Sequence, residues 1–463
     1  MKTPAKCQKI CFCHYGIGWR DGVNVVLRNL TGGLKKRCPS LDIFLLGGEI
    51  KEKILEEAHY KTIPELLPTK KKITKSQLKE QSVIIAKKLA RQTKEIDTLI
   101  IENPFMGGYH LSAMLGYWLY AKDYKPQSTK LFFRVHDYFR DSKKYSNKVK
   151  KIFSPKEIKK IINNEKVDGF FVINHSLKEK LIKEGISPKK IFYLPNPIDK
   201  TLFARALTRK EEKLLRKRLL IPIEAKILLY PARVVPRKNI EEAILLTYFL
   251  RKMTGENYAL VISGKVDRHD PEGAEYYQRL KKLTEKLDFP VIFTKGLLPT
   301  EREYDYTGRI KQFSIGDLYK SSQAIITTSQ KEGFGYPFLE CWLARKIVVG
   351  RWLRDVISDF EQSGLNFNWL YHRFFVDEQK TDLAEIENGK NFKRIEKVKN
   401  IFNNKKTLEK LFELNKISLI KTIKVLQDKK SQKEIIKKNL ERVRKVYEIS
   451  KVTEQFLKLV RIK

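Results

Sequence analysis

Two glutamates flank a glycine turn in the segment AIITTSQKEGFGYPFLECW, residues 324–342. Glu332 precedes Gly333 and Gly335, and Glu340 follows them, with seven residues between the two carboxylates. A carboxylate accepts hydrogen bonds from two hydroxyl groups at once. The pair therefore suits a ligand with hydroxyls on both sides of a diphosphate. The alternative is that Glu340 only offsets a helix dipole and Glu332 is a solvated loop residue.

The elements expected around this turn would place it where anions bind. Residues Ala324 to Thr328 are apolar and β-branched, which predicts a buried strand. Pro337 is typical of the first turn of a helix. In an α/β sheet, such a strand-to-helix junction lies at the carboxyl ends of the strands and presents unpaired N–H groups. We therefore expect a phosphate site at this turn.

Two basic residues in the segment PARVVPRKN could neutralise the same phosphate. Arg233 and Lys238 follow a predicted strand, Ile227 to Tyr230, and precede a helix that begins near Ile240. The turn should lie beside Gly333 to Gly335, so both cations could converge on one diphosphate. A leaving diphosphate gains negative charge as its glycosidic bond breaks, and prepositioned cations stabilise that charge. The alternative is a pair of solvated surface charges.

Polar residues also follow two predicted strands in the first half of the chain. The strand Thr98 to Ile101 runs into Asn103, and the strand Leu131 to Val135 runs into His136 and Asp137. Carboxyl ends of strands are where α/β folds place their chemistry. Asp137 is expected to hold the His136 imidazole in one tautomer and to favour its protonated form. The alternative is a structural His–Asp pair.

A glycine-rich loop near the start of the chain is a second candidate site. It follows the predicted strand Lys9 to His14 and precedes a predicted helix, Val23 to Leu34. Gly18 and Gly22 leave the backbone open to an anion or a sugar beside that helix. Asp21 is expected either to cap the helix or to contact a ligand.

The cysteines predict neither a disulfide framework nor a metal site. The chain has five cysteines, an odd and small number. Cys7, Cys11, Cys13 and His14 have a ligand-like spacing, but Cys11 and Cys13 lie in an apolar run whose alternate residues share one strand face. Buried thiols are therefore favoured over metal ligands.

Length and composition set the domain organisation. The 463 residues allow two or three domains, and strand–helix alternation restarts after the turn NPID at residues 196–199. We predict domains over residues 1–198 and 199–438, followed by a packing helix in 439–463 with apolar residues at helical spacing between Asn439 and Leu459. Residues 49–94 are expected to be rich in helix, and Ser176 is expected to cap a helix that runs to Lys183.

The net charge of +40 could indicate nucleic acid, an anionic membrane surface or anionic substrates. Basic residues are dispersed and mixed with acidic ones, which favours a lysine-rich solvated surface over a nucleic-acid arm. Peripheral attraction to anionic lipid is a secondary interpretation. No apolar run approaches the ~20 residues of a membrane span, and the N-terminus lacks a signal-peptide pattern, so a cytoplasmic location is expected.

With these motifs in order along nearly the whole chain, the sequence resembles the retaining glycosyltransferases of GT-B fold, in the glycosyltransferase family 4-like group 1. This family includes sucrose-phosphate, glycogen and many glycolipid mannosyl- or glucosyl-transferases. The motifs that carry the resemblance are DGVNVVL, IENPFMGG, RVHDYFR, LPNPID, PARVVPRKN, VISG, DLY and EGFGYPFLE. The last looks like the family's Glu-x7-Glu signature. The combination of DGV, ENP and HD looks most like a subgroup acting on small soluble acceptors such as glycerate glycosides.

The resemblance implies an α/β architecture of two Rossmann-like domains facing across a cleft, with the C-terminal helix crossing back to the first domain. It implies that Arg233 and Lys238 hold the donor diphosphate, while Glu332 binds the donor sugar and Glu340 the ribose. The other implied contacts are Phe334, Gly333, Gly335 and Gly264 on the donor side, Gly18 and Gly22 in the first loop, His136 over the transferred sugar, and Asp21, Asn103 and Asp137 on the acceptor side. The family needs no metal for transfer, so no cofactor is expected.

The expected activity is retaining transfer of glucose or mannose from a UDP- or GDP-sugar to a hydroxyl acceptor. A GT-B-fold glycoside phosphorylase and a sugar-nucleotide epimerase are the alternatives within the same fold. A nucleic-acid-binding protein, suggested by the charge alone, ranks last because the sequence shows no aromatic-basic binding motif.

Overall fold

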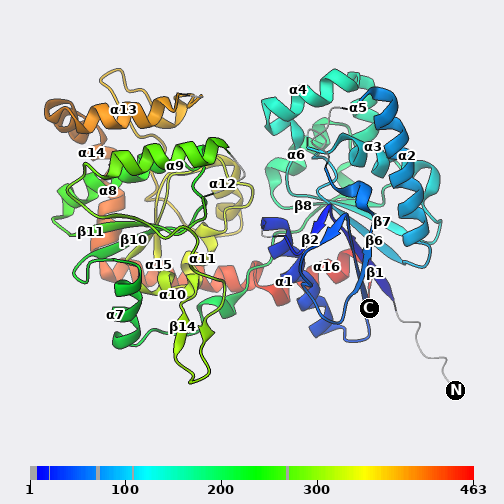
Figure 1. The fold of residues 1–463 in the computed structure, drawn as a ribbon, viewed down its shortest axis with the longest axis horizontal. Helices are drawn as coiled ribbons and strands as arrows, with labels where there is room; N and C mark the ends of the chain where they lie inside the picture. Colours follow the sequence, from blue (N-terminus) through cyan, green and yellow to red (C-terminus); the bar gives the residue numbers. More distant parts are fainter. Residues whose placement is uncertain are drawn as a thin grey trace. The chain divides into compact units, whose positions relative to one another are not determined.

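The computed structural model describes residues 8–19, 21–68, 73–106, 109–266, 271–389 and 391–462. The chain forms two compact units (Figure 1). Unit 1 comprises Met1–Asp199 together with Val446–Lys463, and unit 2 comprises Lys200–Lys445. Cys7 and the two glycines of the IENPFMGG motif lie outside the described residues.

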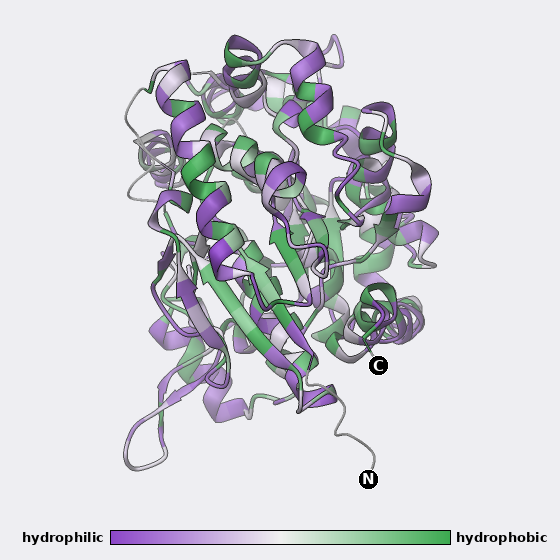
Figure 2. Ribbon diagram, turned by 90° about the vertical axis from the view of Figure 1, so that its right-hand side faces the viewer, coloured by the Kyte–Doolittle hydropathy of each residue, from purple (hydrophilic) through white to green (hydrophobic). Residues whose placement is uncertain are grey.

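Unit 1 is built on a seven-stranded parallel sheet in the described part of the chain, with the order β5-β3-β1-β6-β7-β8-β9. Its strands are β1 (Lys9–Cys13), β3 (Asp42–Gly47), β5 (His59–Thr62), β6 (Thr98–Glu102), β7 (Lys130–Val135), β8 (Gly169–Val172) and β9 (Ile191–Tyr193). The short strands β2 (Gly16–Ile17) and β4 (Glu49–Ile50) pair beside it. Apolar residues gather on the strands, as parallel sheets covered on both faces require (Figure 2).

Helices cover both faces of this sheet. They are α1 (Gly22–Arg37), α2 (Lys75–Gln92), α3 (Leu111–Leu119), α4 (Lys143–Ile152), α5 (Pro155–Ile162), α6 (His175–Lys183) and α16 (Ile449–Val460). Alternate residues of β1 face opposite ways. Ile10 and Phe12 enter a core formed with α1 and α16, whereas Cys13 on the other face contacts Tyr117 of α3.

Unit 2 repeats the plan around a five-stranded parallel sheet, β12-β11-β10-β15-β16. Its strands are β10 (Lys226–Tyr230), β11 (Tyr258–Ile262), β12 (Val291–Phe293), β15 (Ala324–Thr327) and β16 (Ile347–Gly350), with a separate hairpin of β13 (Glu303–Tyr304) and β14 (Ile310–Gln312). Its helices are α7 (Arg209–Arg218), α8 (Ile240–Thr254), α9 (Pro271–Thr284), α10 (Ile315–Ser321), α11 (Pro337–Leu343), α12 (Arg354–Gln362), α13 (Lys393–Phe402), α14 (Lys405–Gln427) and α15 (Lys429–Val446).

The end of the chain returns to unit 1, which confirms the expected crossing back. The prediction of one packing helix between Asn439 and Leu459 is wrong, however, because α15 ends at Val446 and α16 begins at Ile449. The break is fixed from outside the helices, since the backbone N–H of Ile198 donates to the carbonyl of Tyr447 at 2.8 Å.

Two local predictions in unit 1 also need correction. Residues 49–94 contain β4 and β5 before the long helix α2, so their first half is not helical. Helix α6 is capped by Asn174, whose side chain accepts a hydrogen bond from the backbone N–H of Leu177 at 2.7 Å, and not by Ser176. Among the described residues, no helix is long and apolar enough to cross a bilayer.

Phe456 is a test of how much α16 contributes to unit 1. Its ring is fully buried and packs against Phe12 and Phe171, with ring centroids 5.9 and 5.7 Å away. Phe456→Ala should lower the free energy of unfolding by about 3–5 kcal/mol because it removes the ring and leaves a cavity. Urea unfolding measures this loss. Ile417→Ala on exposed α14 is the control and should change stability by less than about 0.5 kcal/mol.

Candidate active site

The turn after β10 carries a buried lysine. A short 3₁₀ helix, Pro236–Lys238, is followed by Asn239 in the left-handed backbone region at φ 51°. Asparagine is one of the few residues that adopts this conformation readily. Lys238 is 7% exposed. The turn therefore places an ammonium group at the carboxyl end of the sheet with little access to water.

Glu332 is the direct partner of this lysine. The Lys238 ammonium forms an ion pair with the Glu332 carboxylate, which comes from the loop after β15. The Ser329 hydroxyl donates to the same carboxylate oxygen at 2.6 Å. Arg237 lies 3.6 Å from the second oxygen and donates to the carbonyl of Lys331 at 2.9 Å. Arg237 and Ser329 were not predicted, although Arg237 is adjacent to Lys238 in the sequence.

The surroundings of the ion pair lower the pKa of both Lys238 and Glu332. Burial lowers the pKa of Lys238, and the neighbouring Arg237 and Arg233 cations lower it further, while Glu332 opposes them. Burial raises the pKa of Glu332, but Lys238 and Arg237 together outweigh burial and hold that pKa below its usual value. Arg233 is thus near enough to Lys238 to act on its charge. Lys238 and Glu332 are in direct contact, whereas Arg233 acts on Lys238 through its charge.

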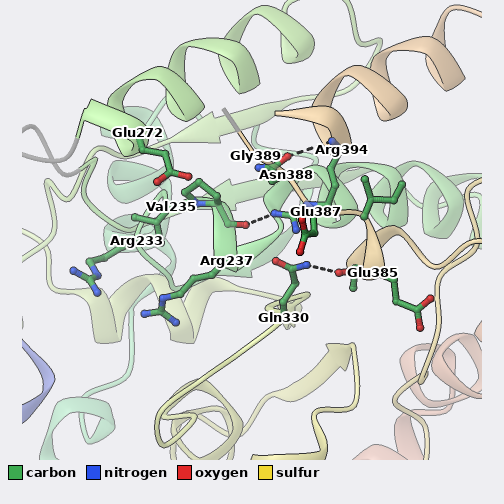
Figure 3. Close-up of a pocket in the computed structure, with 13 residues that line it drawn as sticks. Arg233, Val235, Arg237, Glu272, Gln330, Glu385, Glu387, Asn388, Gly389 and Arg394 are labelled. Atoms are coloured by element: carbon green, nitrogen blue, oxygen red, sulfur yellow. Dashed lines mark hydrogen bonds between the residues drawn. The ribbon is translucent and has the colours of Figure 1, made fainter. Parts of the chain in front are cut away.

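Arg233 and Arg237 also border a hollow of about 630 Å³ (Figure 3). Both guanidinium groups are exposed and come from the turn after β10. The opposite wall is formed by residues 384–389, and Gln330 reaches across to donate to the carbonyl of Ala384. The hollow is therefore bounded by the turn that carries Lys238.

The predicted glycines allow close backbone approach. Gly335 has φ +86°, and a Cβ there would collide with Val356. A Cβ at Gly264 would overlap the carbonyl of Ala232, just before Arg233. Phe334 between the two turn glycines is buried and packs edge-on against Phe360. The glycine turn (residues 333–335) and the turn that carries Arg233, Arg237 and Lys238 (residues 233–239, the cation turn) are therefore both closely packed against neighbouring atoms.

Glu340 has a different environment from Glu332. It lies in the first turn of α11 and accepts a hydrogen bond from the Tyr319 hydroxyl at 2.6 Å. Burial raises the pKa of Glu340, and the Tyr319 hydroxyl offsets part of that rise. The two glutamates therefore differ in how strongly they hold a proton. Cations favour the ionised form of Glu332, whereas burial favours the protonated form of Glu340, whose partner is a neutral phenol.

The strand ends of unit 1 form a second cluster. His136 Nε2 lies 2.6 Å from a carboxylate oxygen of Glu102, and both side chains are buried. The prediction that Asp137 orients this imidazole is wrong. Asp137 instead pairs with Asn103, accepting from the Asn103 amide at 3.1 Å while its own backbone N–H donates to Asn103 Oδ1 at 2.9 Å.

Glu102 is held ionised beside this histidine. Burial raises the pKa of Glu102, but Arg134, 4.0 Å away, and His136 together outweigh burial and hold the pKa below its usual value. Arg134 is fully buried and donates to Asn196 Oδ1 at 3.3 Å. Glu102 directly follows the predicted strand Thr98 to Ile101 in the sequence, but its role as the partner of His136 was not predicted.

The first loop is held by its own side chains. Asp21 caps α1 by accepting from the backbone N–H of Asn24 at 2.9 Å, so its capping role is observed. Asn24 in turn accepts from the backbone N–H of Gly18 at 2.8 Å. Gly18 has φ +73° and lies against the backbone of Glu52, whereas a Cβ at Gly22 would meet open space.

The described cysteines of β1 are free thiols. Cys11 and Cys13 are buried, and burial raises the pKa of each, to about 12 for Cys11. In the described ranges, no group of three or more His, Cys, Asp or Glu side chains is arranged to hold a metal ion.

The comparisons with known proteins agree with the resemblance carried by the sequence motifs. Residues 211–385, which include the cation turn and both glutamates, match the family "Glycosyl transferases group 1". The solved structures similar to the chain are GT-B glycosyltransferases. The family match and the solved structures therefore support the resemblance to group 1 glycosyltransferases, and the solved structures show the expected GT-B fold.

Among the relatives, the chain is 28% identical to mannosylglucosyl-3-phosphoglycerate synthase of Petrotoga mobilis over 50% of this chain and 43% of that protein. It covers about half the length of the curated relatives it matches. Among solved structures, a glycosyltransferase from Rickettsia africae has a TM-score of 0.62 at 14% identity, covering 99% of this chain and 98% of the other. HepE of Anabaena, solved in complex with UDP-glucose, has a TM-score of 0.59 at 14% identity over 98% and 99% of the two chains.

Tyr319→Phe tests the surroundings of Glu340. Without the hydroxyl, the pKa of Glu340 should rise further, so the folded state should disfavour the carboxylate more. Stability should then fall by about 1–3 kcal/mol, and the loss should grow as the pH rises above the usual value of the carboxyl. Urea unfolding at pH 5 and pH 8 measures this difference. Equal losses at both pH values would contradict the interpretation, and Tyr306→Phe at a fully exposed tyrosine is the control.

Proposed function

We propose that this protein is a retaining glycosyltransferase that moves a hexose, glucose or mannose, from a UDP- or GDP-sugar to a hydroxyl acceptor. The observation that carries the proposal is the Lys238–Glu332 ion pair beside Arg233 at the carboxyl ends of the unit 2 strands. The family match over residues 211–385 supports the transfer class.

The ion pair can serve a donor without being broken. A lysine ammonium has three N–H donors, and Glu332 accepts from it through one oxygen, Oε1. The remaining donors, with the exposed guanidinium of Arg233, are suited to the oxygens of a diphosphate. Glu332 stays ionised in this setting and can accept hydrogen bonds from the hydroxyls of the donor sugar.

The cations act most strongly when the glycosidic bond breaks. The diphosphate leaves with an added negative charge, and Arg233 and Lys238 stabilise that charge from fixed positions. In a front-face displacement, the departing phosphate oxygen accepts the proton of the acceptor hydroxyl. The acceptor oxygen then bonds to the anomeric carbon on the face the diphosphate has left, so the configuration is retained. No step in this scheme uses a metal ion.

Two comparisons support the choice of donors. HepE has been solved in complex with UDP-glucose, and the relative from Petrotoga mobilis is named for the synthesis of a mannosylglucosyl glycerate phosphate. We propose that Glu340 binds the ribose, that His136 contacts the transferred sugar, and that Asn103 contributes to the acceptor side. The buried Glu102 would fix the orientation of the His136 ring.

Loss of either cation should slow transfer. Lys238→Ala should reduce turnover by about 10²–10³-fold because it removes a charge aimed at the leaving group. Arg233→Ala should reduce turnover at least roughly tenfold, and because Arg233 is exposed the variant should fold normally. Release of UDP or GDP measures the rate, and Lys213→Ala on α7 is the exposed control. Unchanged turnover in both variants would disprove the proposed role.

A panel of UDP- and GDP-sugars should identify the donor. A ligand that binds only the folded protein stabilises it by about 2.7 kcal/mol at a hundredfold excess over its Kd. We expect one nucleotide sugar to raise the melting temperature clearly more than the others. If glycoside cleavage instead requires inorganic phosphate and no nucleotide raises the melting temperature, the protein is a phosphorylase.

A further inference from the structure

The turn that presents Arg237 and Lys238 is held at every carbonyl from residue 236 to residue 239. These carbonyls accept hydrogen bonds, in order, from the guanidinium of Arg394, the backbone N–H of Gln330, the hydroxyl of Tyr230 and the hydroxyl of Thr328. The Gln330 and Thr328 bonds measure 2.9 and 2.7 Å. The turn is therefore fixed by four groups outside it.

Arg394 differs from the other three in its origin. Gln330, Tyr230 and Thr328 lie on the adjacent strands β10 and β15 or just after them, within the residues that match the family. Arg394 comes from α13, beyond the end of that match at residue 385. The link from α13 to the cation turn is thus a feature of this chain outside the matched segment.

Arg394 lies among the residues that line the hollow beside the turn of Arg237 and Lys238 (Figure 3). It is 2% exposed, and its Nε donates to a Glu241 carboxylate oxygen at 2.6 Å. Glu241 belongs to the first turn of α8 and also accepts from the Tyr276 hydroxyl. A second nitrogen, Nη2, donates to the carbonyl of Pro236. The planar fork therefore joins the cation turn to the start of the helix that follows it.

A buried ion pair of this kind is weak evidence for stability, because the loss of hydration offsets the attraction between the charges. Its contribution here is geometric. Lys238 has to meet Glu332 and a diphosphate at once, and a shift of about 1 Å in such a group can weaken its action strongly. Four described groups donate hydrogen bonds to the carbonyls of the turn. Among them, Arg394 is the one that reaches the turn from a helix, α13, and not from the strands β10 and β15 or the residues just after them.

We propose that Arg394 is a positioning residue for the donor diphosphate, acting through the carbonyl of Pro236 on Arg237 and Lys238. The proposal rests on the proposed function for its effect on binding. Arg394 does not contact the diphosphate. It sets the place of Lys238, which the proposed function assigns to the diphosphate, and of Arg237, which lies beside the same Glu332 carboxylate.

The test removes the buried pair as a whole so that no lone charge remains. In the double variant Arg394→Met, Glu241→Gln, the glutamine still accepts from Tyr276 but the bond to Pro236 is lost. The matched control is Arg302→Met, Asp317→Asn, which removes another buried ion pair of unit 2, with an N–O distance of 2.6 Å. Calorimetric titration with inorganic pyrophosphate, UDP and GDP should show roughly tenfold weaker binding in the first variant. The control should bind as the wild type does.

Two further variants separate positioning from support of the fold. Arg394→Lys keeps the charge beside Glu241 but not the fork, so its melting temperature should stay near that of the wild type while diphosphate affinity remains reduced. In a Lys238→Ala background, removing the Arg394–Glu241 pair should weaken binding less than it does in the wild type, because the two changes act on one interaction. Wild-type affinity in the double variant would overturn the proposal.

Hydrogen exchange decides the inference even if no nucleotide binds. The amide N–H groups of Lys238, Asn239 and Gln330 all form hydrogen bonds within or to the turn. Their exchange should become at least about tenfold faster in the Arg394 double variant and stay unchanged in the control. A wild-type protein that binds no diphosphate would refute the proposed function alone. Unchanged exchange at these amides would refute the positioning role.

Discussion

The ion pair between Lys238 and Glu332 is the constraint on which the site depends. Each side chain is about nine-tenths buried. Without its partner, either group would lose its charge or, if it stayed charged, would destabilise the fold. They lie 94 residues apart in sequence and come from the loops after β10 and β15. These strands are neighbours in the sheet, so the parallel topology brings their carboxyl ends together. The contact between Lys238 and Glu332 therefore requires that β10 and β15 pair correctly.

Glu332 and Glu340 lie close in sequence at the carboxyl edge of the unit 2 sheet, yet their pKa values shift in opposite directions. Glu332 faces two cations, Lys238 and Arg237, whereas Glu340, one turn into α11, faces the hydroxyl of Tyr319. Spacing alone does not set these differences, because the partners come from α10 and from the turn after β10. Two acids of one short sequence segment can therefore have pKa values shifted in opposite directions, below the usual value for Glu332 and above it for Glu340.

The strand ends and the glycine turn could be predicted because they depend on local patterns. Apolar runs followed by polar or glycine residues mark β10, β15, β6 and β7 in the sequence, and the structure has strands at all four. The proximity of Arg233 and Lys238 followed from their place in one turn.

The partner of His136 could not be predicted in the same way. Asp137 is its neighbour in sequence, but Glu102 is its diagonal neighbour across the β6–β7 pair, where Glu102 is in register with Arg134. Side chains two residues apart on a strand share a face, so the sheet favours Glu102. Arg394 was missed for a related reason: it lies 153 residues from Glu241 in a charged helix, and its sequence context resembles that of many exposed basic residues.

The return of α16 to unit 1 has a consequence for how the chain is made. Phe456, Val452 and Val460 complete the core around β1 and α1, yet they are synthesised after all of unit 2. Residues 200–445 are therefore complete on the ribosome while the first unit still lacks part of its apolar core. Domains usually finish folding in the order of synthesis, N-terminal first. In this protein the second unit can reach its native state earlier, and the first unit must keep an apolar surface open until α16 has been synthesised.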